Sequence, residues 1–304
     1  MRVSGLIALA LVDVVRHGDA LNHSILNEPE FTKRSEARPA PPAAITHRLP
    51  PLTSPIFGLK SSRLPLVYRG VLLDLYGTLV HDDEDLVPPI CAIVAERAAV
   101  SPAAVEREWF RRLYQEADLA QGGAFRTLAD LNLSSLEAAA EHFGHRVDAR
   151  ALCREQMAFW RRPPLFADSL PFLREVGIPV CLVSDADRDD VSAVVARHSL
   201  AVEAIVTSQD ARAYKPRPEP FRLALARLEL DARDVLHVGD SLASDVAGAQ
   251  ALGIDTALVV RGRHRQLSGT APTYVVPSLT ALLPRFSQHH FGGRVRPAES
   301  QGPA

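Results

Sequence analysis

The sequence predicts an α/β protein with a parallel sheet in its core and an all-helical domain inserted into it. Two observations lead to this prediction. From residue 178 to 261, short apolar segments alternate with amphipathic segments of helical length. Repeated strand–helix–strand units of this kind build a parallel sheet with helices on both faces. Residues 86–165, which follow the first strand signal, carry helical patterns throughout.

The predicted strands are short and apolar. The segment IPVCLVS at 178–184 is continuously apolar, as expected of a strand buried on both faces of a sheet. Further strands are expected at 67–75, 202–208, 234–240 and 255–261, and a short strand and helix within 273–286. The helices between them are expected at 188–199, at 218–230, which opens with prolines, and at 241–253, which ends in Gly253.

The inserted segment contains three predicted helices. Ser101 and Pro102 open the first, since serine is a common N-cap and proline fits the first helical position. The other two lie at 125–144 and 148–162. We therefore expect an α/β core at 67–85 and 166–288 and a helical cap at 86–165.

The two ends of the chain depart from this pattern. Residues 1–66 contain the polar, proline-rich run EARPAPPAAITHRLPPLTSP, which buries too little apolar surface to offset the entropy of ordering. We predict a flexible N-terminal extension at 1–66 and a disordered tail at 289–304.

Composition limits the partners and the compartment. The 304 residues carry a net charge of −2, so no broad basic field indicates nucleic acid or a membrane surface as a partner. No segment reaches the roughly 18 consecutive apolar residues of a membrane-spanning helix. The three cysteines form no CxxC pair, which favours a reducing compartment. We expect a cytoplasmic monomer or homodimer.

The stretch VLLDLYGTLV at 71–80 places a carboxylate at the end of an apolar strand. Asp74 ends that strand, and a tight turn through Gly77 and Thr78 follows. Open α/β sheets bind ligands at the carboxyl ends of strands, and a glycine there lets a substrate approach the backbone. Asp74 is therefore a candidate nucleophile, although an aspartate that caps the turn explains this stretch equally well.

Two further strand ends carry polar side chains. Ser184 ends the strand at 178–184, where a hydroxyl and the N–H groups of a following helix can bind a phosphate. Lys215 follows the strand at 202–208 and can point a positive charge into a cleft at the strand ends. An ordinary N-cap serine and a surface lysine are the alternatives.

The segment HVGDSLASDVAGAQALG places Asp240 and Asp245 at the head of a helix. Together with Asp74 they would repel one another unless a cation lay among them. Mg²⁺ prefers oxygen ligands, and helix capping explains only one of the two aspartates well. The sequence therefore predicts a Mg²⁺ site.

Together these segments resemble the four ordered motifs of the haloacid dehalogenase (HAD) superfamily. The resemblance rests on DLYGT at 74–78, Ser184, Lys215 and GDSxxxD at 239–245. It covers roughly residues 66–288, with a helical cap between the first two motifs. It implies a Rossmann-like core and a hydrolase that acts through a covalent aspartyl intermediate.

The resemblance also implies a role for each matching residue. Asp74 would attack the substrate, and Lys215 would balance the charge on both. Oxygens of the transferred group would be bound by Thr78 and Ser184, and the substrate would be contacted by Gly77 and Asp185. The implied residues of the Mg²⁺ site are Asp74, Tyr76 through its backbone carbonyl, Asp240, and Asp245 in support of the metal shell.

One position departs from the pattern of the phosphatases in this superfamily. They usually carry a second aspartate two residues after the nucleophile, where this chain has Tyr76. Tyrosine, with a reference pKa of about 10, is a poor general base at neutral pH. DxYGT instead resembles the 2-haloacid dehalogenase branch, which usually lacks the metal aspartate that this chain keeps in GDSxxxD.

We therefore expect a Mg²⁺-dependent phosphatase that acts on a small phosphorylated, and hence anionic, metabolite. The alternative is a 2-haloacid dehalogenase, whose anionic substrate the extra carboxylates would repel. A third hypothesis, of another class, is a catalytically weak relative that binds a phosphate ligand. His81, Asp82 or Asp83 could supply the missing acid, although HDDED at 81–85 has the composition of a solvated acidic loop.

The cap is expected to select the substrate. Its arginines could bind an anionic tail and its aromatic residues could line an apolar pocket, although solvated helix faces and cap packing account for them as well. These residues are Arg107, Arg111, Arg112, Arg126, Trp109, Phe110 and Phe125.

Overall fold

The computed structural model of the chain describes residues 68–261 and 270–286. The predicted N-terminal extension at 1–66 and the predicted tail at 289–304 lie outside the described residues. Within the described ranges, no helix combines the length and the apolar character needed to cross a membrane.

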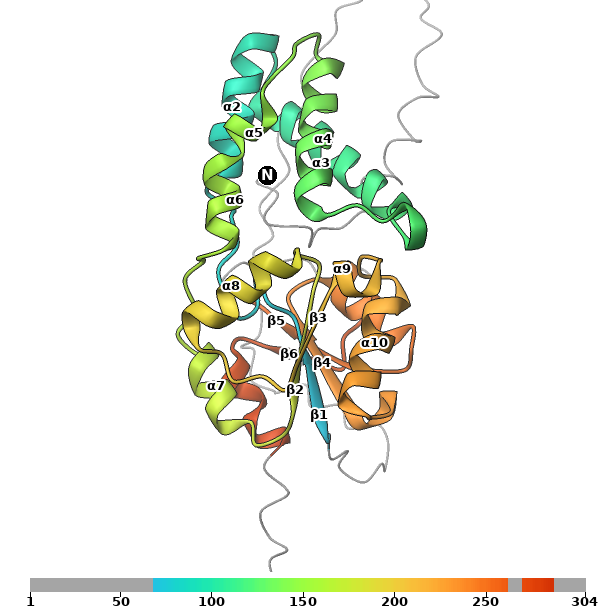
Figure 1. The fold of residues 1–304 in the computed structure, drawn as a ribbon. Helices are drawn as coiled ribbons and strands as arrows, with labels where there is room; N and C mark the ends of the chain where they lie inside the picture. The colour runs from blue at the N-terminus through green and yellow to red at the C-terminus, as the bar shows by residue number, and fades with distance from the viewer. Residues whose placement is uncertain (1–67, 262–269, 287–304) are drawn as a thin grey trace, which may run out of the picture. The chain divides into compact units, whose positions relative to one another are not determined.

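The strands of the described residues form one parallel sheet in the order β3-β2-β1-β4-β5-β6. Figure 1 shows α7 and α8 on one face of this sheet and α10 on the other. The predicted α/β fold with a parallel sheet is confirmed. The strands are β1 (Gly70–Leu73), β2 (Val180–Ser184), β3 (Ala204–Thr207), β4 (Val235–Gly239), β5 (Asp255–Val259) and β6 (Tyr274–Val276).

β1 lies in the middle of the sheet, and its side chains alternate between two apolar layers. Val71 and Leu73 belong to the buried cluster that contains Phe172 of α7, whereas Leu72 belongs to the cluster that contains Phe221 of α10. Successive residues of a strand point to opposite faces. Helices on both faces therefore bury β1 at every position, and this explains its continuous apolar sequence.

The helices of the core begin and end close to the predicted positions, with one exception. The helix predicted at 241–253 starts with a π-helical turn, Leu242–Val246. Ser241 Oγ accepts from Ser244 N (3.1 Å), and the carboxylate of Asp245 accepts from Ser241 N (3.1 Å). Local side-chain bonds of this kind compete with a regular helix. The α-helices are α7 (Ser169–Glu175), α8 (Arg188–His198), α9 (Ser208–Ala211), α10 (Pro218–Leu228) and α11 (Ala247–Gln250), and the 3₁₀ turns are Ala232–Asp234 and Leu279–Arg285.

The chain between β1 and α7 forms a helical insert. Ser101 and Thr127 cap α3 and α4, each accepting a hydrogen bond of 3.2 Å from the N–H group three residues later. The single helix expected at 148–162 is interrupted at Cys153, where α5 ends and α6 begins. The insert comprises α2 (Val87–Ala98), α3 (Pro102–Leu119), a 3₁₀ turn (Gly122–Ala124), α4 (Leu128–His142), α5 (Ala149–Leu152) and α6 (Arg154–Trp160).

Hydrogen bonds join the insert to the core. The two carboxylate oxygens of Asp187 accept from Leu128 N (2.9 Å) and Ala129 N (3.0 Å), which are the first N–H groups of α4. The hydroxyl of Tyr214 donates to the carbonyl of Arg126 (2.8 Å). A carboxylate of the core thus caps a helix of the insert, where it also interacts favourably with the helix dipole.

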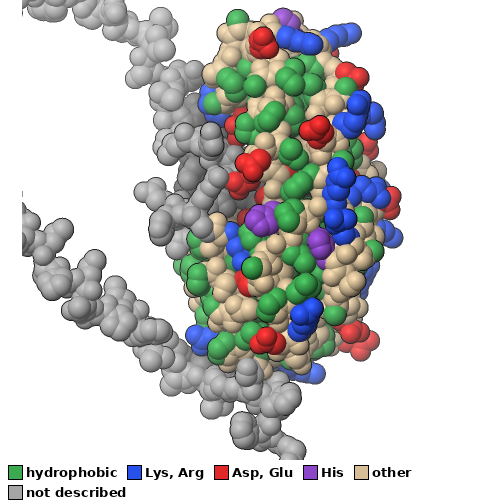
Figure 2. Space-filling model, turned by 90° about the vertical axis from the view of Figure 1, so that its left-hand side faces the viewer, with side chains coloured by type: hydrophobic (Ala, Val, Ile, Leu, Met, Phe, Trp, Pro, Cys, Tyr) green, Lys and Arg blue, Asp and Glu red, His purple; other side chains and the backbone are tan. Residues whose placement is uncertain are grey.

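The surface mixes side chains of different kinds. On the face drawn in Figure 2, acidic, basic and apolar side chains are interspersed. The large apolar side chains that are exposed among the described residues are Ile93, Leu119 and Val275. Single exposed apolar residues of this kind are normal for a globular protein.

Candidate active site

β1, β2 and β4 are neighbours in the sheet, so the residues that follow them meet at one edge. A pocket of about 300 Å³, part of it open solvent, lies at this edge. The structure brings most of the predicted site residues together there. Its lining consists of Asp74, Tyr76, Ser184, Asp185, Ala186, Lys215, Asp240, Ser241, Ser244 and Asp245.

Lys215 joins two carboxylates of this pocket. Its Nζ donates to Asp74 Oδ1 (2.8 Å) and to Asp245 Oδ1 (2.7 Å), and all three side chains are buried. Burial opposes the charged form of Lys215, but the surrounding carboxylates hold its pKa well above the usual value. Burial raises the pKa of Asp74, and the charge of Lys215 offsets part of this effect.

His237 belongs to the same network, although sequence reasoning missed it. It lies in β4, fully buried, with Nε2 3.0 Å from Asp245 Oδ1. Because Ser241 N donates to Asp245 Oδ2, both carboxylate oxygens of Asp245 have partners. Burial opposes ionisation of Asp245, but Lys215 and His237 outweigh it and hold the pKa of this carboxyl well below its usual range. The sequence did contain a signal of this role, namely a histidine inside an apolar strand, because a buried imidazole needs a polar partner.

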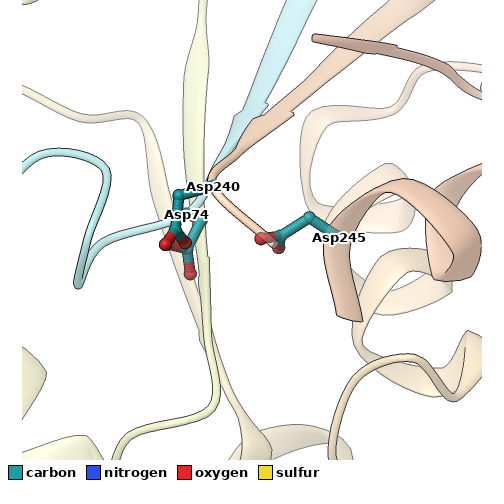
Figure 3. A group of neighbouring side chains, drawn as sticks. All are labelled: Asp74, Asp240 and Asp245. Atoms are coloured by element: carbon teal, nitrogen blue, oxygen red, sulfur yellow. The ribbon is translucent and has the colours of Figure 1, made fainter. Parts of the chain in front are cut away.

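Three carboxylates lie close together at the edge of the sheet, as Figure 3 shows. One oxygen each from Asp74, Asp240 and Asp245 lies within 4.8 Å of the others. Gly77 packs directly against this cluster, because a Cβ at Gly77 would lie 2.6 Å from Asp240 Oδ2. Its φ of +77° also suits glycine. This donor set has the oxygen chemistry of a Mg²⁺ site.

Two predicted residues at the end of β2 line the pocket. Asp185 Oδ1 accepts from Lys215 N (2.8 Å). Burial raises the pKa of Asp185 to about 7, against the opposing charge of Lys215, and a carboxyl with such a pKa can both give and take a proton at neutral pH. Ser184 Oγ accepts from Ala186 N (3.2 Å), so its own O–H can still donate to a ligand.

Thr78 and Tyr76 follow the candidate nucleophile but differ in environment. Thr78 is fully buried, and its Oγ1 has no hydrogen-bond partner among the described residues. The hydroxyl of Tyr76 donates to the backbone carbonyl of Trp160 in the insert. Burial, with nearby carboxylates, raises the pKa of Tyr76 far above its usual value. Tyr76 therefore cannot serve as a base at neutral pH.

The expectation of a solvated acidic loop at 81–85 is wrong for Asp83. This residue is 2% exposed, and its Oδ2 accepts from Gln156 Nε2 (2.8 Å) and Trp160 Nε1 (2.9 Å). Both partners belong to α6, far along the chain, so the local composition of HDDED gave no sign of them. Asp83 lies among the helices of the insert instead of in solvent.

The candidate residues of the cap are mostly engaged within the insert. Arg111 and Arg112 pair with Glu108, and Arg126 pairs with Glu116. Trp109 is fully buried and donates to the carbonyl of Asn132 (3.1 Å). These contacts fit the expectation of helix-face and packing roles. Phe110 differs from them, since it lines a second pocket.

A comparison with protein families identifies the family to which this chain belongs. The profile of a family of hydrolases, described as haloacid dehalogenase-like hydrolase, matches residues 68–253. The chain belongs to this family. The resemblance found in its motifs is thus confirmed, and the protein is a HAD-like hydrolase.

Curated relatives of this HAD-like hydrolase include phosphatases. It is 27% identical over 220 residues to the phosphoglycolate phosphatase of Yersinia pseudotuberculosis, which covers 71% of this chain and 92% of the relative. Identity is 32% over 121 residues with pyrophosphatase PpaX of Bacillus velezensis and 33% over 93 residues with ribulose-1,5-bisphosphate 5-phosphatase of Halopiger xanaduensis. These matches cover 38% and 30% of this chain, but only 55% and 39% of the two relatives.

Solved structures with the same fold include dehalogenases and other HAD hydrolases. L-2-haloacid dehalogenase from Xanthobacter autotrophicus matches with a TM-score of 0.56 and 20% identity, over 72% of this chain and 98% of that one. The putative HAD-hydrolase YfnB from Bacillus subtilis, bound to magnesium, matches with a TM-score of 0.57 and 19% identity, over 72% and 99%. At these identities the likeness concerns the fold alone.

Proposed function

We propose that this HAD-like hydrolase is a Mg²⁺-dependent phosphatase of small phosphorylated metabolites that works through a covalent intermediate on Asp74. The charge of the pocket carries the proposal. Four carboxyl groups and one ammonium group line it, those of Asp74, Asp185, Asp240, Asp245 and Lys215. An anionic substrate can bind among so many carboxylates when a cation neutralises them.

The residues of the pocket fit a magnesium ion. Asp74, Asp240 and the backbone carbonyl of Tyr76 would hold it, since Mg²⁺ prefers oxygen ligands. Both oxygens of Asp245 already accept hydrogen bonds, so we infer that Asp245 supports the metal site by fixing Lys215. When bound, the ion would neutralise charge on the phosphoryl group during transfer.

The nucleophile is prepared by its neighbours. An oxygen of Asp74 would attack phosphorus, and the bond from phosphorus to the leaving oxygen would break, so that the phosphoryl group stays on Asp74. Lys215 favours the ionised form of Asp74 and orients it. The hydroxyls of Thr78 and Ser184 can donate to the phosphoryl oxygens as their charge develops.

The leaving oxygen needs a proton that Tyr76 cannot supply. In this proposal the proton comes from Asp185, which lines the pocket and has a pKa of about 7. The ionised Asp185 would then take a proton from the water that hydrolyses the phosphoaspartate. This role would replace the missing aspartate at position 76.

The same charges disfavour the alternative reaction. The carboxylate of a 2-haloacid would face the carboxyls of the pocket with Lys215 as the only cation among its lining residues. The curated relatives described above are phosphatases, which also supports the proposal. Likeness to the dehalogenase structures concerns the fold, which both activities share.

The test is release of inorganic phosphate from a panel of phosphate monoesters and acyl phosphates, with Mg²⁺ and with EDTA. We expect Mg²⁺-dependent release that falls to background in Asp74→Asn, which keeps the shape of the side chain but removes the nucleophile. Asp189→Asn, at an exposed position of α8, is the matched control and should behave as wild type.

Other outcomes would overturn the proposal in distinct ways. Phosphate release that persists in EDTA or in Asp74→Asn would contradict the metal or the nucleophile. Chloride release from 2-chloropropionate in EDTA, without phosphatase activity, would establish the dehalogenase. Binding of phosphate with no turnover of any substrate would establish the phosphate-binding relative.

A further inference from the structure

A second pocket lies among the helices of the insert, and we call it the cap pocket. It comprises about 220 Å³ of space, part of it open solvent, and is lined by Asp83, which precedes α2, and by side chains of α3, α4 and α6. Its polar lining residues besides Asp83 are Asn132 and Gln156, and its aromatic residues are Phe110 and Trp160. The activity proposed above uses none of them.

Asp83 places a carboxylate oxygen in the cap pocket without a partner. Its Oδ2 accepts from Gln156 and Trp160, whereas Oδ1 is buried and has no hydrogen-bond partner among the described residues. Burial raises the pKa of this carboxyl, and the bonds from Trp160 and Gln156 oppose that effect. An unsatisfied carboxylate oxygen in the interior is costly, and a bound donor would relieve the cost.

The neighbours of Asp83 cannot turn to satisfy Oδ1. The amide of Gln156 is fixed at both ends, because its Nε2 donates to Asp83 Oδ2 and its Oε1 accepts from Asn132 Nδ2 (3.0 Å). The indole of Trp160 has a single N–H, which already bonds to Oδ2. The missing donor must therefore come from outside this network.

The lining of the cap pocket selects a positively charged donor. The carboxylate of Asp83 and the aromatic side chains of Phe110 and Trp160 line the same pocket, and no lysine or arginine is among its lining residues. Carboxylates attract ammonium groups by charge-assisted hydrogen bonds, and aromatic faces attract them through the ring quadrupole. An anion would meet only repulsion here.

Tyr76 connects the cap pocket to the catalytic pocket. It lines the catalytic pocket, and its hydroxyl donates to the carbonyl of Trp160, whose residue lines the cap pocket. The two pockets therefore meet at the hydrogen bond between Tyr76 and Trp160.

We propose that the cap pocket binds a protonated amine, whose ammonium group donates to Asp83 Oδ1 and faces Phe110 and Trp160. The amine is carried either by the leaving group of the substrate or by a separate small molecule, and the recognition chemistry is the same in both cases. The first case rests on the proposed phosphatase function, and the second does not.

The direct test measures amine binding without turnover. Propylamine and its uncharged analogue propanol are titrated into the full chain by calorimetry, and tryptophan fluorescence reports on the indole bonded to Asp83. Asp83→Asn keeps an oxygen for Gln156 and Trp160 but removes the charge. We expect wild type to bind propylamine and not propanol, and Asp83→Asn to bind it about tenfold or more weakly, as for the loss of a charge-assisted hydrogen bond.

Two further variants keep this test decisive. Asp85→Asn, at an exposed position in the same acidic segment, is the matched control and should bind propylamine as wild type does. Phe110→Leu removes an aromatic face, keeps the carboxylate and should weaken binding several-fold. Thermal unfolding of each variant is recorded first. Absence of propylamine binding by wild type would overturn the proposal. Binding of propylamine by both Asp83→Asn and Phe110→Leu as tightly as by wild type would overturn it as well.

A kinetic arm identifies the source of the amine. Phosphate release is compared for aminoalkyl phosphates, from aminoethyl to aminohexyl, and for the matching alkyl phosphates. If the leaving group carries the amine, kcat/KM for one aminoalkyl phosphate should exceed that of its alkyl counterpart by about tenfold, and Asp83→Asn should lose this preference. Equal kcat/KM values together with propylamine binding would identify a separate molecule. No phosphate release from any ester would overturn the phosphatase function, and the titration would still decide amine binding.

Discussion

Replacing Asp185 by asparagine should make the protein more stable at neutral and higher pH. Burial raises the pKa of Asp185 to about 7 from an ordinary value of 3.8. Between these values the folded protein keeps a proton that the unfolded chain has lost, so the free energy of unfolding falls as pH rises. Over this interval the loss amounts to roughly 4 kcal/mol, at about 1.4 kcal/mol per pH unit. Asparagine avoids the loss and still accepts from Lys215 N.

Urea unfolding of wild type and Asp185→Asn in EDTA, at several pH values, measures this effect. The two proteins should be equally stable at about pH 3 and below, where the carboxyl is mostly protonated in both states, and the variant should gain up to about 4 kcal/mol near pH 8. Asp189→Asn, at an exposed position of α8, should follow wild type throughout. A difference that does not change with pH, or a less stable Asp185→Asn at pH 8, would refute the reasoning.

Three further substitutions test other parts of the site. Lys215→Met should lower the free energy of unfolding, measured in urea, by about 3–5 kcal/mol, because it leaves buried carboxylates unpaired. Arg222→Met, at an exposed position, should lower it by under about 0.5 kcal/mol. Equal losses of stability in the two variants would argue against the pairing. Tyr76→Phe should keep kcat for phosphate release within about tenfold of wild type, since the hydroxyl is engaged by a backbone carbonyl; a larger loss would give this hydroxyl a part in the reaction. Gly239→Ala should destabilise the protein and abolish phosphate release, because a Cβ there would lie 2.2 Å from the carboxylate carbon of Asp245. Gly123→Ala, whose Cβ would have no atom within 4 Å, should behave as wild type. A thermal melt of Gly239→Ala that matches wild type would contradict this packing.

Much of the fold could be predicted because local pattern and burial coincide. The continuous apolar run at 178–184 contains β2, which is buried at every position, as a strand covered on both faces must be. Ser101 and Pro218 mark helix starts in the structure, since capping depends on neighbours in sequence. The helix predicted at 241–253 differs because the Asp245 carboxylate bonds back to a backbone N–H group. That contact also holds the carboxylate beside Lys215.

The convergence of Asp74, Ser184 and Asp240 could be predicted because parallel strands end at the same edge of a sheet. The surroundings of Asp83 could not, because composition describes a segment and burial depends on the whole fold. The acidic run around Asp83 has the composition of a solvated loop, yet the hydrogen-bond partners of Asp83 lie in α6. The raised pKa of Asp185 could not be predicted either, because burial produces it and burial depends on the whole fold.

The measurement that tests the central claim most directly is chemical trapping of the phosphoryl group on Asp74. The protein is quenched in acid while it turns over a phosphate ester with Mg²⁺, and it is then treated with borohydride, which reduces an acyl phosphate. Mass spectrometry of the peptide that contains Asp74 reads the outcome. We expect this aspartate to be converted to homoserine, and to stay unchanged without substrate or without Mg²⁺. Phosphate release with an unmodified Asp74, or conversion of another residue, would contradict the assignment of the nucleophile.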